Sequence, residues 1–412
     1  MASSLYTLFL FFVTFTCSSV YAANVPSNGL VLPVRKDAKT SQYYATLEMG
    51  SNRATVNAVI DLGSQFLWFA CDSYTSSTYN PIPCGTKKCE LAKGIGCMGC
   101  NLPPRPGCTN DTCGSSPYNP FKNMLYAEGF AEDTLYSKNN LKVPELPFSC
   151  FHAEYLEGFA SLATGMLGLA RTEIALHKQV ANKFKLPHKF ALCIPSDKGV
   201  GKIFIGDDKY TTKSLVSTRL IINPVSTYPI YTEGDPSDEY FINVQSISVD
   251  GRPLAIKTSY FSIDEKGVGG TKISTINNFT VLHNSIYKPL TRAFVKAASN
   301  MKIKSVAAVA PFRACFSAES ITKSGTGPSV PTIDIVLPGK DIYWRIYGAN
   351  SMVKVNNNVL CLAFVDGGKE PRTSIVIGGH QLEDNLIEFD LVSSKLSFTS
   401  SLLLQNSSCS RV

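Results

Sequence analysis

The sequence predicts a mainly β fold of two lobes with a few small helices. Short runs rich in β-branched and aromatic residues recur along the chain and end at Gly, Pro, Asn or Asp, which is typical of strands separated by turns. Only residues 171–184 and 285–300 place apolar side chains at helical spacing. A chain of 412 residues is too long for one ordinary core, so we expect an N-terminal lobe at 23–215 and a C-terminal lobe at 216–412.

The expected strands occur in both halves of the chain. They cover residues 43–50, 54–63, 189–195, 201–207, 240–251, 271–276, 332–339, 360–367, 374–379 and 386–400.

A weak internal repeat favours the same division into two lobes. The turn at residues 61–64 is followed about a hundred residues later by the apolar-apolar-Gly segment 164–169. In the second half, the segment 272–276 is followed at a similar separation by 374–379. We therefore expect each lobe to place a later strand beside one such turn and so to fix the geometry of the turn.

Residues 1–22 are typical of a secretory signal peptide. An apolar run is followed by small residues, and Ala22 offers a cleavage site. The run is too short to cross about 30 Å of hydrocarbon, so we expect no membrane segment. The mature protein is expected to be secreted and extracellular.

Cysteine usage agrees with an exported protein. Of thirteen cysteines, Cys17 lies in the signal segment, and the remaining even number predicts six disulfides of undetermined connectivity. A zinc site at Cys97 and Cys100 would need a second pair or clustered histidines, so no metal or other cofactor is expected. The disulfide candidates are Cys71, Cys84, Cys89, Cys97, Cys100, Cys108, Cys113, Cys150, Cys193, Cys315, Cys361 and Cys409.

Charge and glycosylation signals describe the expected surface. The net charge of +7 comes without a run of Lys or Arg, which argues against nucleic acid and suits either an acidic partner or simple solubility. Asn-x-Ser/Thr acceptors occur at Asn110, Asn278 and Asn406, although Asn278 lies in a segment expected to be mostly buried. We expect a monomer.

Two turns resemble the active turns of pepsin-like aspartic proteases, and the resemblance extends over essentially the whole mature chain. Asp61 begins a match to the first catalytic turn, with Leu62 where a Thr is expected. Tyr126 resembles the tyrosine at the tip of the flap hairpin. Ser274 stands where the second catalytic aspartate is expected. The resemblance implies a bilobal pepsin-like fold with a degenerate dyad.

A single carboxylate cannot perform the chemistry of the pair. Two carboxyl groups about 3 Å apart share one proton, and this sharing gives one group the role of base and the other the role of acid. We therefore expect Asp61 to bind local backbone N–H groups, and Leu62 to fill part of the abandoned cleft. Asp264 and Glu265 are expected at a hairpin tip far from Asp61. The alternative is an active, atypical aspartic protease.

Longer segments are similar to a non-proteolytic plant branch of this family. Five segments resemble extracellular dermal glycoproteins, xyloglucan-specific endoglucanase inhibitors and basic 7S globulins. They are residues 269–287, 309–316, 327–337, 350–368 and 372–391. The resemblance implies an apoplastic defence protein that inhibits microbial cell-wall-degrading glycoside hydrolases, above all a family 12 xyloglucan endo-β-1,4-glucanase. The other interpretation is a storage or peptide-binding protein like the basic 7S globulins.

The resemblance also implies where a hydrolase would bind. A glycosidase presents two carboxylates about 5 to 9 Å apart, and a planar Arg side chain can engage a carboxylate bidentately. Arg372 matches one inhibitory position of the C-terminal half. At a second loop Gly325 replaces the expected Arg, and Lys323 lies two residues earlier. We expect Arg372 and Lys323 to contact the hydrolase, although both also fit ordinary surface positions in a weakened or retargeted inhibitor.

Overall fold

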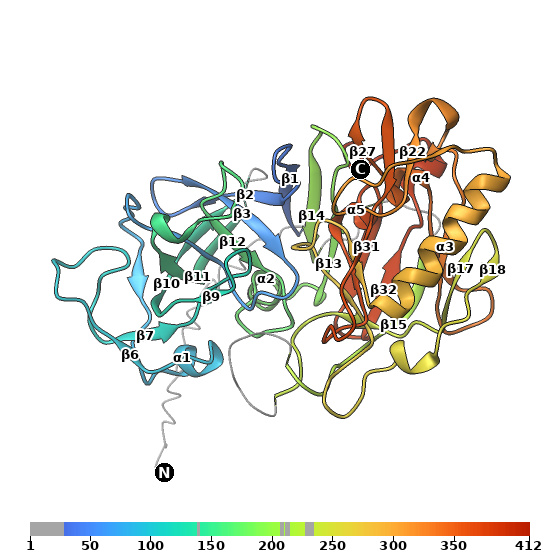
Figure 1. Ribbon diagram of the computed structural model, residues 1–412. Coiled ribbons are helices and arrows are strands. Elements are labelled where there is room, and N and C mark those ends of the chain that lie inside the picture. Colours follow the sequence, from blue (N-terminus) through green and yellow to red (C-terminus); the bar gives the residue numbers. More distant parts are fainter. Residues whose placement is uncertain (1–28, 138–140, 207–209, 211–214, 227–234) are drawn as a thin grey trace, which may run out of the picture.

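The computed structural model shows a mainly β molecule of two lobes (Figure 1). It describes residues 29–137, 141–206, 210, 215–226 and 235–412. The predicted signal segment at 1–22 lies outside the described residues. None of the described helices is both long and apolar enough to cross a bilayer.

The first half forms most of the lobe drawn in blue and green. Its helices are α1 (Lys87–Leu91) and α2 (Leu176–Phe184). Its strands are β1 (Leu30–Lys36), β2 (Tyr43–Met49), β3 (Ala54–Asp61), β4 (Trp68–Ala70), β5 (Asn80–Pro81), β6 (Cys97–Met98), β7 (Thr112–Ser115), β8 (Tyr118–Asn119), β9 (Met124–Leu125), β10 (Glu128–Tyr136), β11 (Lys142–Phe151), β12 (Gly165–Gly168), β13 (Lys189–Cys193) and β14 (Gly201–Ile205).

The second half forms the lobe drawn in yellow to red. Its helices are α3 (Asn284–Asn300), α4 (Gly348–Ser351) and α5 (Gly379–Leu382). Its strands are β15 (Val216–Ile221), β16 (Phe241–Ile242), β17 (Ser246–Val249), β18 (Arg252–Pro253), β19 (Thr271–Ile273), β20 (Thr280–Leu282), β21 (Ser305–Val306), β22 (Cys315–Ser317), β23 (Lys323–Ser324), β24 (Gly327–Pro328), β25 (Ile333–Val336), β26 (Tyr343–Ile346), β27 (Met352–Asn356), β28 (Val359–Leu362), β29 (Phe364–Asp366), β30 (Ile375–Ile377), β31 (Leu386–Asp390) and β32 (Lys395–Phe398).

A six-stranded antiparallel sheet joins the two lobes. Its strand order is β1-β14-β13-β31-β32-β15, so strands from the two halves meet where β13 pairs with β31. At that junction Phe190 and Phe389 lie opposite each other with stacked rings 4.7 Å apart. One buried apolar cluster includes side chains from both lobes. Burial of this cluster opposes separation of the lobes.

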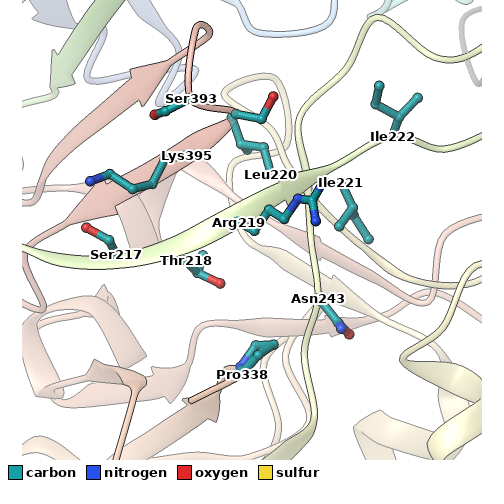
Figure 2. Close-up of a pocket in the computed structure, with 11 residues that line it drawn as sticks. Ser217, Thr218, Arg219, Leu220, Ile221, Ile222, Asn243, Pro338, Ser393 and Lys395 are labelled. Carbon is teal, nitrogen blue, oxygen red and sulfur yellow. The ribbon is translucent and has the colours of Figure 1, made fainter. Parts of the chain in front are cut away.

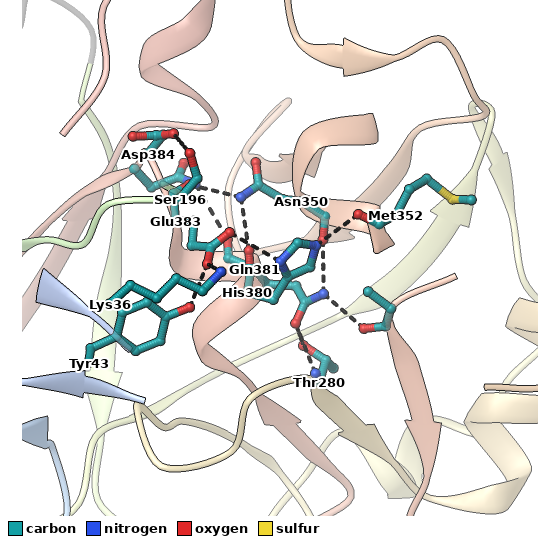
Figure 3. Close-up of polar contacts among 12 residues, drawn as sticks. Lys36, Tyr43, Ser196, Thr280, Asn350, Met352, His380, Gln381, Glu383 and Asp384 are labelled. Atoms are coloured by element: carbon teal, nitrogen blue, oxygen red, sulfur yellow. Dashed lines mark hydrogen bonds and ion pairs between the residues drawn. The ribbon is translucent and has the colours of Figure 1, made fainter. Parts of the chain in front are cut away.

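A buried polar network crosses the same interface (Figure 3). Glu383, which directly follows α5, accepts hydrogen bonds from Lys36 Nζ at 2.5 Å and Tyr43 Oη at 2.7 Å, both from the first half. Its other carboxylate oxygen lies 3.1 Å from Nδ1 of His380. The Nε2 atom of His380 lies 3.0 Å from the carbonyl oxygen of Met352. Glu383 therefore links the N-terminal strands to the C-terminal lobe.

The two predicted helices exist, but one is shorter than predicted. α3 agrees with the expected segment and buries Ile286, Leu290 and Phe294 on one face. α2 begins only at residue 176, because tertiary contacts hold the residues before it. The Arg171 N–H donates to the carbonyl oxygen of Asp238 at 2.9 Å, which ties this residue to the second half of the chain. The Ala175 N–H donates to the carbonyl oxygen of Thr172 at 3.4 Å, which is the i to i−3 bond of a turn.

The prediction of six disulfides is confirmed. Cys97 and Cys100 are bonded to Cys84 and Cys108, so neither supplies a thiolate to a metal. Across the described ranges, no group of three or more His, Cys, Asp or Glu side chains is arranged to hold a metal ion. The pairs are Cys71–Cys150, Cys84–Cys97, Cys89–Cys113, Cys100–Cys108, Cys193–Cys409 and Cys315–Cys361.

Candidate functional site

The two active turns are built alike. β12 lies parallel to β3 with Gly168 opposite Asp61, and β30 lies parallel to β19, whose next residue is Ser274. The Ser274 N–H donates to the carbonyl oxygen of Ile377 at 2.9 Å. A Cβ on Gly168 or Gly378 would lie 2.5 or 2.4 Å from backbone atoms, so both strands must end in Gly to pass beside the turns. The predicted threading of a later strand beside each turn is confirmed.

Asp61 and Ser274 perform the same structural task in their turns. The Asp61 carboxylate accepts a hydrogen bond from the Gly63 N–H at 2.7 Å. The Ser274 hydroxyl accepts from the Ile276 and Asn277 N–H groups at 3.2 and 3.3 Å. Each turn therefore keeps a side-chain oxygen that binds its backbone, whereas only the first turn keeps a carboxylate.

Thr275 connects the two turns. The Thr275 hydroxyl donates to the carbonyl oxygen of Ile60 at 2.6 Å and accepts from the Leu62 N–H at 3.4 Å. Leu62 has no hydroxyl with which to return such a contact. Its side chain is 1% exposed and belongs to the main hydrophobic core. Leu62 therefore packs within the main core.

Burial raises the pKa of Asp61 to about 6. The carboxyl is 7% exposed, and desolvation penalises its charged form. The Gly63 N–H and the charge of Lys272 favour the charged form, while the nearby negative charge of Glu239 disfavours it. Asp61 consequently carries a proton for part of the time at mildly acidic pH.

Glu239 is a second carboxylate in the cleft that sequence reasoning missed. Its Oε1 lies 3.0 Å, and Asp61 Oδ1 lies 3.4 Å, from the position that a Cβ on Gly63 would occupy. Glu239 Oε1 is also 2.8 Å from Nζ of Lys272 on β19. Glu239 therefore forms an ion pair. No motif distinguishes this residue, because it reaches the site only through the tertiary fold.

Asp264 and Glu265 lie where the sequence suggested. Both are exposed, and Asp264 Oδ1 accepts from the N–H groups of Lys266 and Val268 at 2.9 and 2.8 Å. Such bonds are typical of a turn in which an aspartate binds the backbone that follows it. The carboxylate that acts on Asp61 is thus Glu239 and neither of these two.

The hairpin of β8 and β9 differs from the predicted flap in the position of one residue. Its tip is formed by residues 120–123 between β8 and β9, whereas Tyr126 follows β9. The placement of Tyr126 at the tip is therefore wrong, and its ring stacks on Tyr155 at 4.4 Å. Tyr118 lies on β8, and burial together with the charge of Asp61 raises the pKa of Tyr118. Tyr118 is the hairpin tyrosine that Asp61 influences.

Arg372 is exposed at the base of β30. Its carbonyl oxygen accepts from the Gly269 N–H at 2.8 Å, which fixes the backbone. Its Nη2 donates to the carbonyl oxygen of Ser226 at 3.1 Å, and it forms no ion pair with any residue that the structure describes. Val268, next to Gly269 in the chain, is 42% exposed. The site combines a cation on a fixed backbone with a nearby apolar side chain.

Lys323 lies on the exposed β23–β24 hairpin. Together with Lys354 it lines a pocket of about 430 Å³ whose apolar residues include Ile321 and Leu360. In the described part of the chain neither lysine has an ion-pair partner. A Cβ on Gly325, in the hairpin turn, would meet no atom within 4 Å. The turn therefore has room for a larger side chain.

The three predicted glycosylation positions differ in exposure. Asn110 and Asn406 are exposed. Asn278 is not: its Nδ2 donates to the carbonyl oxygen of Thr40 at 2.8 Å, and its Oδ1 is buried. Thr40 belongs to the first half of the chain, so Asn278 forms a contact between the two lobes.

The lobes, the joining sheet and the paired turns together define an aspartic-protease-like protein. The chain belongs to the xylanase-inhibitor family, because residues 43–207 match the family described as Xylanase inhibitor N-terminal and residues 239–400 match Xylanase inhibitor C-terminal. The resemblance found in the sequence and the predicted pepsin-like fold are thereby confirmed.

Relatives cover nearly the whole chain. A probable aspartic proteinase GIP2 of Nicotiana benthamiana is 45% identical over 97% of this chain and 95% of that protein. The crystal structure of edgp matches with a TM-score of 0.90 and 46% identity, covering 93% of this chain and 97% of that one. The crystal structure of basic 7S globulin from soybean matches with a TM-score of 0.78 and 30% identity, covering 91% and 97%.

Proposed function

We propose that this protein is secreted, lacks proteolytic activity, and binds and inhibits a microbial glycoside hydrolase that degrades plant cell walls. The leading candidate is a family 12 xyloglucan endo-β-1,4-glucanase. The observation that carries the proposal is Arg372, an exposed cation without a carboxylate partner among the described residues, in a chain of the xylanase-inhibitor family.

The state of the cleft supports the absence of proteolysis. Ser274 supplies a hydroxyl where the second carboxylate of the dyad is needed, so Asp61 has no partner with which to share a proton. Glu239 does not replace it, since Lys272 neutralises that carboxylate. The cleft keeps its turn geometry and loses its acid–base chemistry.

Arg372 suits the active site of a glycosidase. A guanidinium has five N–H donors in a planar fork, and Arg372 uses one nitrogen for its contact with Ser226. The remaining donors would bind one or both carboxylates of the hydrolase in charge-assisted hydrogen bonds. Exposed Val268 nearby would add an apolar contact and exclude water around the charged pair.

Lys323 would make a second and weaker contact. Its ammonium is a point charge on a flexible stem and lacks the bidentate geometry of Arg. Lys354 lines the same pocket and adds a second positive charge facing an acidic partner. We propose a monomeric glycoprotein of the apoplast, with glycans at Asn110 and Asn406 and an unmodified Asn278.

Titration of a xyloglucan endoglucanase and a xylanase with the purified mature protein tests the proposal. Wild type should inhibit one of them, and Arg372→Ala should weaken inhibition by about 30-fold or more, since truncating a hot-spot Arg costs roughly 2 kcal/mol or more. Arg252→Ala is the matched control, because Arg252 is also exposed in the C-terminal lobe. If neither hydrolase is inhibited, the proposal fails. If Arg372→Ala and Arg252→Ala inhibit equally well, Arg372 is not the anchor.

Further measurements on the same purified protein distinguish two other functions from hydrolase inhibition. The structural match to soybean basic 7S globulin favours a storage or peptide-binding role, which accumulation in seeds without any inhibition of hydrolases would support. An active protease would cleave a denatured protein near pH 4 in a pepstatin-sensitive manner that Asp61→Ala abolishes. We expect no such cleavage.

A further inference from the structure

The joining sheet ends in an open edge at β15. β15 follows β32 in the strand order, and Val216 to Arg219 pair with β32 alone among the strands that the structure describes. β16 joins β15 only at Leu220 and Ile221. The first four residues of β15 therefore have a described strand on one side only.

The direction of the free backbone groups follows from one hydrogen bond. The Leu220 N–H donates to the carbonyl oxygen of Ser394 at 2.8 Å, so the backbone groups of Leu220 point toward β32. Residues of an antiparallel pair alternate in this respect, so Thr218 also bonds to β32, while Ser217 and Arg219 direct their N–H and C=O groups away from it. These outward groups have no partner among the described residues. The hydroxyls of Ser217 and Ser397 lie 3.0 Å apart, as expected for a non-hydrogen-bonded pair.

A groove of about 890 Å³ runs along this edge. Six consecutive residues, 217–222, line it, which means that the backbone of the strand forms its wall. Figure 2 shows Lys395 and Ser393 on one side of β15 and Asn243 and Pro338 on the other. An extended segment could lie between the strand and the far wall.

Charge along the edge is unbalanced. Arg219 lies directly opposite Lys395, which in turn lies opposite Asp390 on β31, so the three form one row across the sheet. Asp390 Oδ1 binds the N–H groups of Val392 and Ser393 at 3.0 Å in the turn. Arg219 has no ion pair within the described residues. Like charges directly opposite each other destabilise a sheet, and an acidic residue on a further strand would complete the row.

We propose that the edge of β15 binds an extended acidic segment of a partner protein as an added antiparallel strand. The segment would exchange hydrogen bonds with Ser217 and Arg219 and place an Asp or Glu side chain opposite Arg219. A second copy of this chain fits poorly, because both edges carry Arg219 and Lys395 and the chain has a net charge of +7. The site shares no residue with the proposed hydrolase contact, so the two proposals stand or fall separately.

The probe is a labelled, end-capped peptide of alternating Glu and Val, about eight residues long. Fluorescence anisotropy with the mature protein should show saturable binding, and the matching Lys–Val peptide should bind at least about tenfold more weakly. Hydrogen exchange at the amides of Ser217 and Arg219 should slow when the Glu–Val peptide is bound. A Glu–Val peptide with alternate backbone nitrogens methylated should not bind, because it lacks donors on the pairing edge. If it binds equally well, the groove recognises only negative charge and strand addition is refuted.

Ser217→Pro removes an outward N–H without touching the bonds to β32, which an edge strand tolerates. It should weaken binding at least about tenfold relative to Ser217→Ala, which loses the same hydroxyl but keeps the N–H. Arg219→Glu should bind the Lys–Val peptide more tightly than the Glu–Val peptide. This variant tests the proposal even if the proline variant does not fold. No binding of the Glu–Val peptide at about 1 mM, equal binding by both Ser217 variants, or an unchanged preference in Arg219→Glu would each overturn it.

Discussion

The Thr275 hydroxyl lies 2.6 Å from the carbonyl oxygen of Ile60, across the junction of the two lobes. The same hydroxyl accepts from the Leu62 N–H at 3.4 Å, whereas the side chain of Leu62 supplies no hydroxyl from the other side. The C-terminal turn presents the hydroxyl of Ser274 rather than a carboxylate, and its Thr275 holds the two turns together.

Thr275→Val should lower the free energy of unfolding by about 1 to 3 kcal/mol. Valine has nearly the same shape but leaves the carbonyl oxygen of Ile60 and the N–H of Leu62 without their buried partner. Thr271→Val is the matched control, because Thr271 is fully buried on β19 and its hydroxyl has no hydrogen-bond partner among the residues that the structure describes. Denaturant titration should find the control neutral or stabilising. Equal losses in both variants would show that the cross-turn bond contributes nothing.

Asp61→Asn should stabilise the protein at neutral pH and not at acidic pH. The pKa of Asp61 is raised from 3.8 to about 6 in the folded state, so the ionised carboxyl opposes folding above that pH. The free-energy cost that Asp61 imposes on folding falls as the pH is lowered from 6 toward 4, where its carboxyl is protonated. The gain from Asn should therefore be roughly 2 to 3 kcal/mol at pH 7.5 and near zero at about pH 4.

Denaturant titrations of wild type and Asp61→Asn across this pH range measure that difference. Glu265→Gln serves as the control, because its exposed side chain is not subject to the same desolvation. A pH-independent difference between wild type and Asp61→Asn would show that burial does not govern this carboxyl.

Glu383→Gln should have the opposite pH dependence. Burial would raise the pKa of Glu383, but the hydrogen bonds and charges of His380 and Lys36 hold it below its ordinary value of 4.5. The stability that Glu383 supplies is therefore present above that value and is lost as the pH falls through the lower folded pKa. At pH 6 the substitution should cost about 3 kcal/mol, since it removes one member of a buried ion pair that links the lobes.

Glu48→Gln is the control for this measurement. Glu48 pairs with Arg53 at 3.5 Å on the surface, and such pairs contribute at most about 1 kcal/mol. Thermal unfolding should show the two variants far apart at pH 6, and the difference between them should shrink as the pH is lowered from about 4.5. Similar unfolding of both variants at pH 6 would mean that the network in Figure 3 does not hold the lobes together.

The parts of the site that could be predicted from sequence are those set by local patterns. The strand before Asp61, the Ser at position 274 and the later strands beside both turns follow from short-range alternation and spacing. Glu239 and Tyr118 carry no such signal, because a loop and a hairpin deliver them to Asp61 only after the lobes have formed. The position of Tyr126 carries no such signal either, because this residue follows β9 and its ring stacks on Tyr155, which lies 29 residues further along the chain.

Gly325→Arg tests whether the second hairpin can regain an anchor, and it rests on the proposed inhibition of a hydrolase. The turn accepts the larger side chain because a Cβ there meets no atom within 4 Å. A guanidinium at this position could bind a carboxylate bidentately, which Lys323 cannot do. Inhibition of the most sensitive hydrolase should tighten by about tenfold or more relative to wild type, equivalent to roughly 1.4 kcal/mol. Gly325→Ala controls for the altered backbone and should leave inhibition unchanged. If Gly325→Arg folds with an unchanged melting temperature and inhibits no better than Gly325→Ala, the β23–β24 hairpin lies outside the interface, and Arg372 alone would remain as the proposed anchor.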